Sequence, residues 1–343
     1  MKIPCYCELE FLKRFTNDIP KTNPYSNGTS DFDIWRNFKK LIFENSRLTV
    51  DNSNKLREWV KEDRKNPLAV ILFKKINEIN EMLIDEINLE TINPHTIFFL
   101  TNTQRCEQLE KKHGMLFVSK ETQRPNGLKL FNEEIVISIN KRNKIKNWDN
   151  ILKNKLPCNS MIIVDNYLFE SKRKIKQNLI KLLSKLLPDE LNSVFQLQII
   201  TEKPNDPKTI PDFFWKLPKE LSKSYKIDLK IIYDTATEAK KHHDRNIITN
   251  YLWINSGRGF SIFETVYKEG RGNVEQVSHN THFFLLAIPR NGIVYDMVNS
   301  LKKDYKELEY NPDENHKKYL KEHVMPKEKA GEITNRLLKI NAD

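Results

Sequence analysis

The chain has 343 residues, of which 38% are hydrophobic and 30% charged, with a formal net charge of +11 at pH 7. This composition is typical of a globular protein and excludes an intrinsically disordered one. No apolar run approaches the ~18 residues of a membrane-spanning helix, and the first residues lack the basic-then-apolar order of a signal peptide. We therefore expect a cytoplasmic protein with enough chain for two domains.

The positive charge favours a polyanionic partner. DNA or RNA is the partner that we expect first, and an anionic membrane surface is the alternative. The richness in Lys, Asn and Ile would also follow from AT-rich codons, so the charge alone does not identify a partner.

The four cysteines show no paired metal-ligand spacing and indicate buried, reduced thiols; they are Cys5, Cys7, Cys106 and Cys158. His279 and His282 are three residues apart, but the surrounding pattern of turn and strand favours a surface pair over a metal site. The sequence therefore predicts neither a bound metal nor a cofactor.

Strand-like and helix-like segments alternate through the first half. Apolar runs predict strands at 2–7, 47–51, 96–102 and 115–119, and helical spacing predicts helices at 8–15, 31–45, 67–87 and 103–114. Gly114 has the place of a residue that ends the last of these helices. This alternation indicates a parallel sheet covered by helices, so the expected fold class is α/β.

The segment 96–119 resembles the later part of PIN-type nuclease domains. That resemblance implies a carboxylate cluster that holds a divalent metal. The strand here ends at Asn102 rather than at an acid, and the spacing of the available carboxylates does not form such a cluster; they are Glu8, Asp31, Asp33 and Asp51. We therefore favour a Rossmann-like domain, either a degenerate PIN-like one or an unrelated one.

A turn at 125–127 and a basic, mixed segment after it indicate a domain junction near residue 145, which gives domains 1–145 and 146–343. The alternation then starts again. Strands are expected at 159–169, 195–202, 227–234, 245–249, 252–255 and 281–289, and helices at 171–188, 210–225 and 235–242, with a charged helical tail from residue 300.

The most informative motif begins at His243, Asp244 and Arg245 and ends, after an apolar run, at the Gly-Arg-Gly-Phe of residues 257–260. Alternation on a strand puts His243 and Arg245 on one face. The spacing resembles the H-x-K-x4-D and G-S-x-N pattern of phospholipase D superfamily phosphodiesterases. On that pattern Arg245 replaces the lysine, Asn250 stands where the acid belongs, and Arg258 replaces the serine.

The motif is more similar still to the phospholipase D-like C-terminal domain of microtubule-interacting-and-transport (MIT) proteins, over about residues 148–290. That branch has an H-D-R triplet, a G-R-G-containing turn and a strand that ends in D-P-Y, which Asp165 and Tyr167 match here. The resemblance implies an α/β sandwich with a metal-independent phosphodiester site. In it His243 is the nucleophile, Arg245 and Arg258 stabilise the phosphoryl oxygens, and Asn250 supports the histidine without a charge.

Further residues join this predicted site. Asp165, Tyr167, Asp244 and His242 lie in the matching segments, and Lys172 and Lys174 open the basic helix that follows Asp165. Because the chain carries one such motif, chemistry that uses two histidines would require a symmetric homodimer.

Three functions remain open from the sequence. The first is a nucleic-acid-binding phosphodiesterase with nuclease-like activity, by analogy from prokaryotic antiviral defence or a toxin-like system. The second is a non-catalytic module that binds phosphate, phospholipid or nucleic acid, as the MIT-associated relatives are thought to do. The third is a PIN-like, metal-dependent nuclease in the first half.

Overall fold

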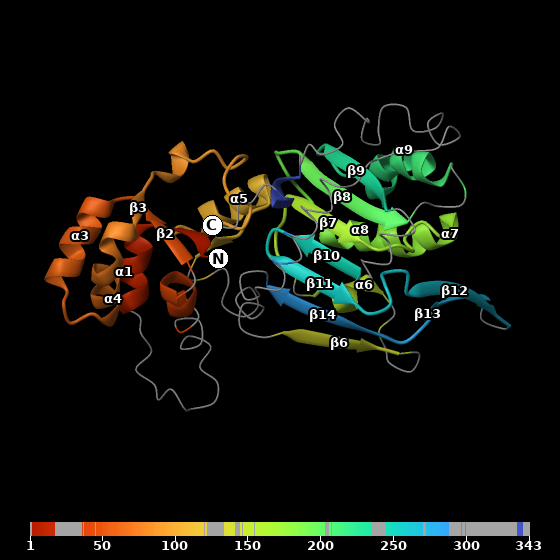
Figure 1. The fold of residues 1–343 in the computed structure, drawn as a ribbon, viewed down its shortest axis with the longest axis horizontal. Helices are drawn as coiled ribbons and strands as arrows, with labels where there is room; N and C mark the ends of the chain where they lie inside the picture. The colour runs from red at the N-terminus through yellow and green to blue at the C-terminus, as the bar shows by residue number, and fades with distance from the viewer. Residues whose placement is uncertain are drawn as a thin grey trace. The chain divides into compact units, whose positions relative to one another are not determined.

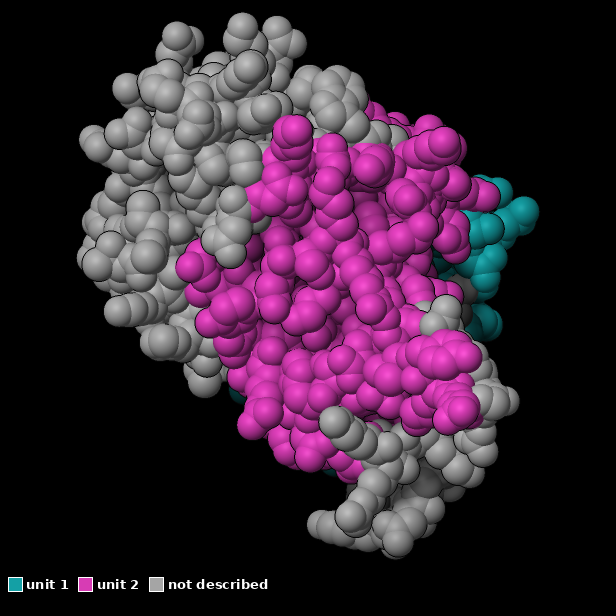
Figure 2. Space-filling view, turned by 90° about the vertical axis from the view of Figure 1, so that its right-hand side faces the viewer, with its two compact units in different colours: residues 1–133, 342–343 teal, residues 134–341 magenta. Residues whose placement is uncertain are grey.

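The structure is a computed structural model, and the residues that it describes are 2–17, 36, 38–44, 46–119, 121, 134–140, 145, 147–153, 155–202, 206, 208–234, 245–269, 272–287, 296, 299 and 335–338. The chain divides into two compact units, coloured separately in Figure 2. The first comprises residues 1–133 and 342–343, and the second residues 134–341. Both units combine helices with β-sheets, so the α/β fold class predicted from the sequence is confirmed.

The first unit contains a parallel sheet of five strands in the order β3-β2-β1-β4-β5 (Figure 1). The strands are β1 (Ile3–Cys7), β2 (Ser46–Val50), β3 (Asn80–Glu81), β4 (Ile97–Phe99) and β5 (Phe117–Val118). Four α-helices of this unit are α1 (Leu9–Asn17), α3 (Ser53–Glu62), α4 (Pro67–Lys75) and α5 (Thr103–His113). The 3-2-1-4-5 order is one that occurs in doubly wound sheets.

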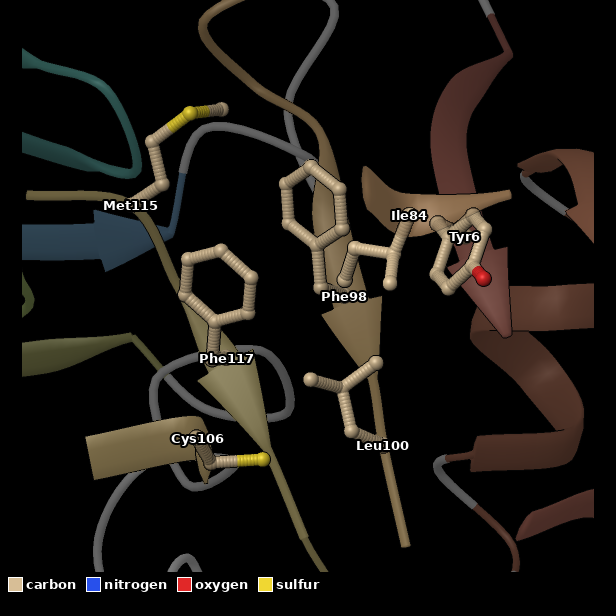
Figure 3. Close-up of a cluster of buried hydrophobic side chains, with 7 residues drawn as sticks. All are labelled: Tyr6, Ile84, Phe98, Leu100, Cys106, Met115 and Phe117. Carbon is tan, nitrogen blue, oxygen red and sulfur yellow. The ribbon is translucent and has the colours of Figure 1, made fainter. Parts of the chain in front are cut away.

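Part of the core of this unit lies on one face of the sheet (Figure 3). Its buried side chains come from β1, β4, β5, α5 and the segments beside them, and they are Tyr6, Ile84, Phe98, Leu100, Cys106, Met115 and Phe117. The rings of Phe98 and Phe117 stack with their centroids 4.5 Å apart. The apolar run of β4 thus buries its side chains as a central parallel strand does, and the side chains of the edge strand β5 are buried as well.

The ends of the helices in this unit follow from local chemistry. The Asn102 side chain accepts a hydrogen bond from the Arg105 amide at the start of α5, and Gly114 ends that helix with φ 61°. The predicted long helix at 67–87 is wrong, because α4 ends at Lys75. Beyond it the backbone of β3 pairs with β2, with Asn80 opposite Thr49, so these residues extend the sheet instead of the helix.

The second unit contains a mixed sheet of seven strands in the order β6-β14-β11-β10-β7-β8-β9 (Figure 1). β7, β8 and β9 are mutually parallel, whereas β10, β11, β14 and β6 follow in antiparallel pairs. The strands are β6 (Ile135–Ile139), β7 (Ser160–Val164), β8 (Phe195–Glu202), β9 (Ile227–Asp234), β10 (Arg245–Thr249), β11 (Leu252–Ser256) and β14 (Thr281–Ala287).

Helices and one hairpin complete this unit. The predicted helix at 171–188 is present as a continuous run with a π-helical middle, formed by α7 (Lys172–Lys174), η4 (Ile175–Ile180) and α8 (Lys181–Leu186). The other helices are α6 (Trp148–Ile151), α9 (Thr209–Leu221) and the short η7 (Arg336–Leu338). A hairpin of β12 (Phe263–Lys268) and β13 (Gly272–Val277) extends beyond the sheet (Figure 1).

The edge strand β6 lies before the predicted junction at residue 145, yet it pairs with β14 in the second sheet. Its alternating pattern, with Ile135, Ile137 and Ile139 more buried than the residues between them, is that of a half-covered edge strand. Within the described part of the chain, we find no helix with the length and apolar character needed to cross a bilayer.

Candidate functional site

The register of the second sheet brings several predicted site residues to one edge. β7 ends at Val164 opposite Asn246, and β11 ends at Ser256 opposite Arg245. β14 runs back antiparallel to β11, with Phe283 opposite Ser256, so the residues that precede β14 reach the same edge. Asp165, Arg245, the 257–260 turn and the 278–280 turn therefore meet there. We call this set the arginine site.

Asp165 is the buried acid of the arginine site, and its hydrogen bonds hold the surrounding backbone. Its side chain is buried, its Oδ1 accepts a hydrogen bond from the Tyr167 amide at 3.0 Å, and its Oδ2 accepts one from the Phe260 amide at 2.8 Å. Burial raises the pKa of Asp165, and the two amides and Arg245 oppose that effect. Asp165 was predicted to bind substrate, but both of its oxygens are bonded within the protein, where they position the turn beside the arginine.

Arg245 is held on three sides. Its Nη1 donates to the Gly257 carbonyl at 2.9 Å, its Nε lies 3.9 Å from Asp165 Oδ1, and its guanidinium lies 5.2 Å from the centre of the Tyr167 ring. The Tyr167 side chain is half exposed, so this cation–π pair sits at the surface. The structure thus brings Arg245, Asp165 and Tyr167 together, as the motif predicts.

The glycine-bracketed turn depends on Gly259. Its φ is +86°, and a Cβ there would lie 2.7 Å from Asp165 Oδ2 and 3.0 Å from Arg245 Cδ. Only glycine fits both the backbone angle and the approach of the carboxylate. Gly257, in contrast, would place a Cβ in open space, and Arg258 between them is exposed.

Two lysines predicted for the site are paired with acids. Lys172 Nζ lies 2.8 Å from Asp212 Oδ2, and Lys174 Nζ lies 2.6 Å from Glu170 Oε2. Lys174 still acts on the arginine site, because its charge, with those of Arg258 and Arg245, contributes to the lowered pKa of His279, of which burial is the first cause. Lys172 and Lys174 thus differ: only the latter has a described electrostatic link to the site.

Sequence reasoning missed two residues here. His279 belongs to the arginine site because it lies just before β14, which pairs antiparallel with β11. The spacing of residues in the sequence does not predict that pairing. Asn178, buried in η4, accepts from the Phe263 amide at 2.7 Å and donates to the Phe263 carbonyl at 2.9 Å. It fixes the chain directly after the Gly-Arg-Gly turn to the basic helix. A buried Asn in an otherwise apolar helical stripe was the available signal.

Three predicted residues, His242, His243 and Asp244, lie outside the described residues. The prediction that Asn250 joins Arg245 in one pocket is wrong. The two residues are at opposite ends of β10, about 17 Å apart at the rise of an extended strand. Asn250 is fully buried, where its Oδ1 accepts from the Asn159 and Ser160 amides and its Nδ2 donates to Asn159 Oδ1 at 2.9 Å.

Placing at this position the acid of the phospholipase D pattern, with Asn250→Asp, should therefore destabilise the protein. The change replaces a donor with a carboxylate in a site that water does not reach, and we expect a loss of roughly 1–3 kcal/mol in the free energy of unfolding at pH 7. Urea unfolding followed by circular dichroism measures it. An Asn250→Asp protein of unchanged stability and stronger phosphodiester binding would instead place this residue in the site.

Among the described residues, the acids at the carboxyl edge of the first sheet bond within the protein, which disfavours the PIN-like alternative. Glu8 Oε2 accepts from the Thr101 amide and hydroxyl at 2.8 and 2.7 Å, and Asp51 Oδ1 accepts from the Leu9 amide at 2.8 Å. Within the described ranges, no group of three or more His, Cys, Asp or Glu side chains is placed to hold a metal. Asp31 and Asp33, the other two acids considered, fall outside those ranges.

A cavity of about 390 Å³ lies at the other edge of this sheet, near the starts of β1 and β2. Lys2, Arg47, Lys75 and Glu78 are among the residues that line it, and Lys2 pairs with Glu78 at 3.3 Å.

No protein-family model matches the chain, and a search of curated proteins gives no match. The assignment of function therefore depends on the arginine site itself.

Proposed function

We propose that this chain binds the phosphodiester backbone of DNA or RNA at the arginine site of its second unit, as a cytoplasmic protein. The observation that carries the proposal is the arrangement of Arg245, which is fixed between Asp165, Tyr167 and the Gly257 carbonyl beside exposed Arg258. Two guanidinium groups at one turn are suited to phosphate oxygens, because each presents a planar set of donors. The net charge of +11 supports a polyanionic ligand.

The half-exposed Tyr167 ring supports nucleic acid over a free phosphate or a phospholipid. Its pairing with Arg245 places an aromatic face beside the cations, and bases stack on such faces in proteins that bind single strands. A lipid headgroup would supply the phosphate without a base. This is why we favour nucleic acid as the ligand.

Removing Arg258 should weaken this binding. Because Arg258 is exposed, Arg258→Met removes one cation with little effect on the core. We expect the affinity for a fluorescein-labelled, single-stranded oligonucleotide to fall about tenfold at low salt, and the slope of log Kd against log salt to decrease by about one. Fluorescence anisotropy over a salt series measures both.

Lys185→Met is the matched control. Lys185 lies in α8 and pairs with Asp149 at 2.7 Å, so its loss removes the same charge away from the arginine site. Equal losses for Arg258→Met and Lys185→Met would indicate that net charge alone attracts the oligonucleotide. Retention of the protein on anionic vesicles but not on the oligonucleotide would favour the lipid-binding alternative.

The phospholipase D-like resemblance extends the proposal to catalysis. In that form His243, two residues before Arg245, attacks phosphorus to form a phosphohistidine, and the P–O bond to the leaving oxygen breaks as that oxygen takes up a proton from solvent. Water then hydrolyses the P–N bond, and the two arginines neutralise the phosphoryl oxygens. The expected result is cleavage of the oligonucleotide that persists in EDTA and is lost in His243→Ala. Binding without cleavage would leave a non-catalytic module, and cleavage that EDTA abolishes would indicate a metal-dependent nuclease. Light scattering tests whether such activity requires a homodimer.

A further inference from the structure

His279 lies in the turn between β13 and β14 with its ring fixed by Ser278. The Ser278 hydroxyl donates to the Ile262 carbonyl at 3.0 Å and lies 2.8 Å from His279 Nδ1. With the Ser278 hydroxyl donating to the Ile262 carbonyl, its oxygen is the acceptor for a proton on His279 Nδ1. The neutral ring therefore has its lone pair on Nε2.

Nε2 is buried, and no described atom meets it in hydrogen-bonding geometry. The Arg258 carbonyl is nevertheless close enough to favour the protonated ring. The opposing influences are stronger: burial first, then the charges of Arg258, Lys174 and Arg245, lower the pKa of His279. In the protein without ligand, the ring is thus an additional cation that its neighbours suppress.

We infer that His279 takes up one proton from solvent when a phosphodiester binds at the arginine site, and so becomes a further cation of that site. The inference rests on the proposed function. A bound phosphate anion offsets the charges of Arg245, Arg258 and Lys174, which reduces the repulsion that acts together with burial to keep the ring neutral. The nearby Arg258 carbonyl also favours the protonated ring, while Nδ1 keeps its contact with Ser278.

Affinity must then depend on pH with a defined sign. The bound state holds one more proton than the unbound state between the two pKa values of His279, so affinity falls as the pH rises through that window. A difference of about one pKa unit between the two states corresponds to about a tenfold loss of affinity. Below both pKa values the dependence levels off.

The experiment measures the affinity of the full chain for a fluorescein-labelled, single-stranded oligothymidylate from about pH 5 to about pH 8, near the ordinary range of histidine. We expect wild-type affinity to fall about tenfold across this range, and His279→Gln to lose that fall. His282→Gln is the control, because His282 is exposed on β14 and bonded to Ser138 at 2.9 Å. It should behave as wild type.

A second measurement follows the ring itself. The NMR titration of His279 should shift toward higher pH when the oligothymidylate is added. If His279→Gln binds with the wild-type pH dependence, the inference is overturned while the proposed function stands. If wild type binds no oligothymidylate at any pH, the proposed function fails and the inference fails with it.

Discussion

Gly259→Ala should reduce the free energy of unfolding by roughly 2–4 kcal/mol and abolish oligonucleotide binding. Two costs combine. Alanine is strained at a φ of +86°, and its Cβ would lie 2.7 Å from Asp165 Oδ2 and 3.0 Å from Arg245 Cδ. The backbone or the Asp165–Arg245 pair must move to relieve that contact. Either movement displaces Arg245 from the position in which it presents its guanidinium group.

Gly257→Ala is the matched control for this change. A Cβ at Gly257 would have no heavy atom within 4 Å, and its φ lies outside the left-handed region. We expect a change in stability within about 0.5 kcal/mol and binding close to wild type. Chemical denaturation and fluorescence anisotropy on the two variants give the comparison. Equal stability of the two would mean that the turn tolerates a side chain at either glycine and does not fix Arg245.

Much of the arginine site could be predicted from the sequence because its parts are local. The Arg245 strand and the Gly-Arg-Gly turn belong to two neighbouring antiparallel strands, and such a pair brings its outer ends together whatever the rest of the fold. The strand that leads to Asp165 could also be predicted, since β7 is buried on both faces and is apolar from Met161 to Val164.

The sequence predictions failed where the structure depends on long-range contacts, because the local spacing of residues does not show which distant strands pair. The segment after Lys75 has helical periodicity, but pairing of Asn80 and Glu81 with β2 overrides it. Asn250 matches a family position by count, but counting along a strand does not show which end faces the site. His279 needed the β11–β14 register, which couples residues far apart in the chain.

Removal of the Asp165 carboxylate should have the largest effect on stability of the changes considered. Asp165→Ala leaves the Tyr167 and Phe260 amides without their acceptor and the mostly buried Arg245 side chain without a counter-charge. Breaking a buried pair by removing one partner costs about 3–5 kcal/mol. Asp149→Ala is the control, because Asp149 pairs with Lys185 at the surface and its loss should cost less than about 1 kcal/mol.

Asp165→Asn keeps the shape of the side chain but removes its ionisable group, so the stability of this variant can be compared with that of wild type as a function of pH. Burial raises the pKa of Asp165 above 3.8, so the folded protein binds more protons than the unfolded chain between 3.8 and the raised value. The stability advantage of wild type over Asp165→Asn is then fully present below pH 3.8 and is lost as the pH rises through the raised pKa. Denaturant unfolding of both proteins across a pH series measures the difference. An advantage that grows with pH would mean that Arg245 and the two amides outweigh burial, and that Asp165 is ionised throughout.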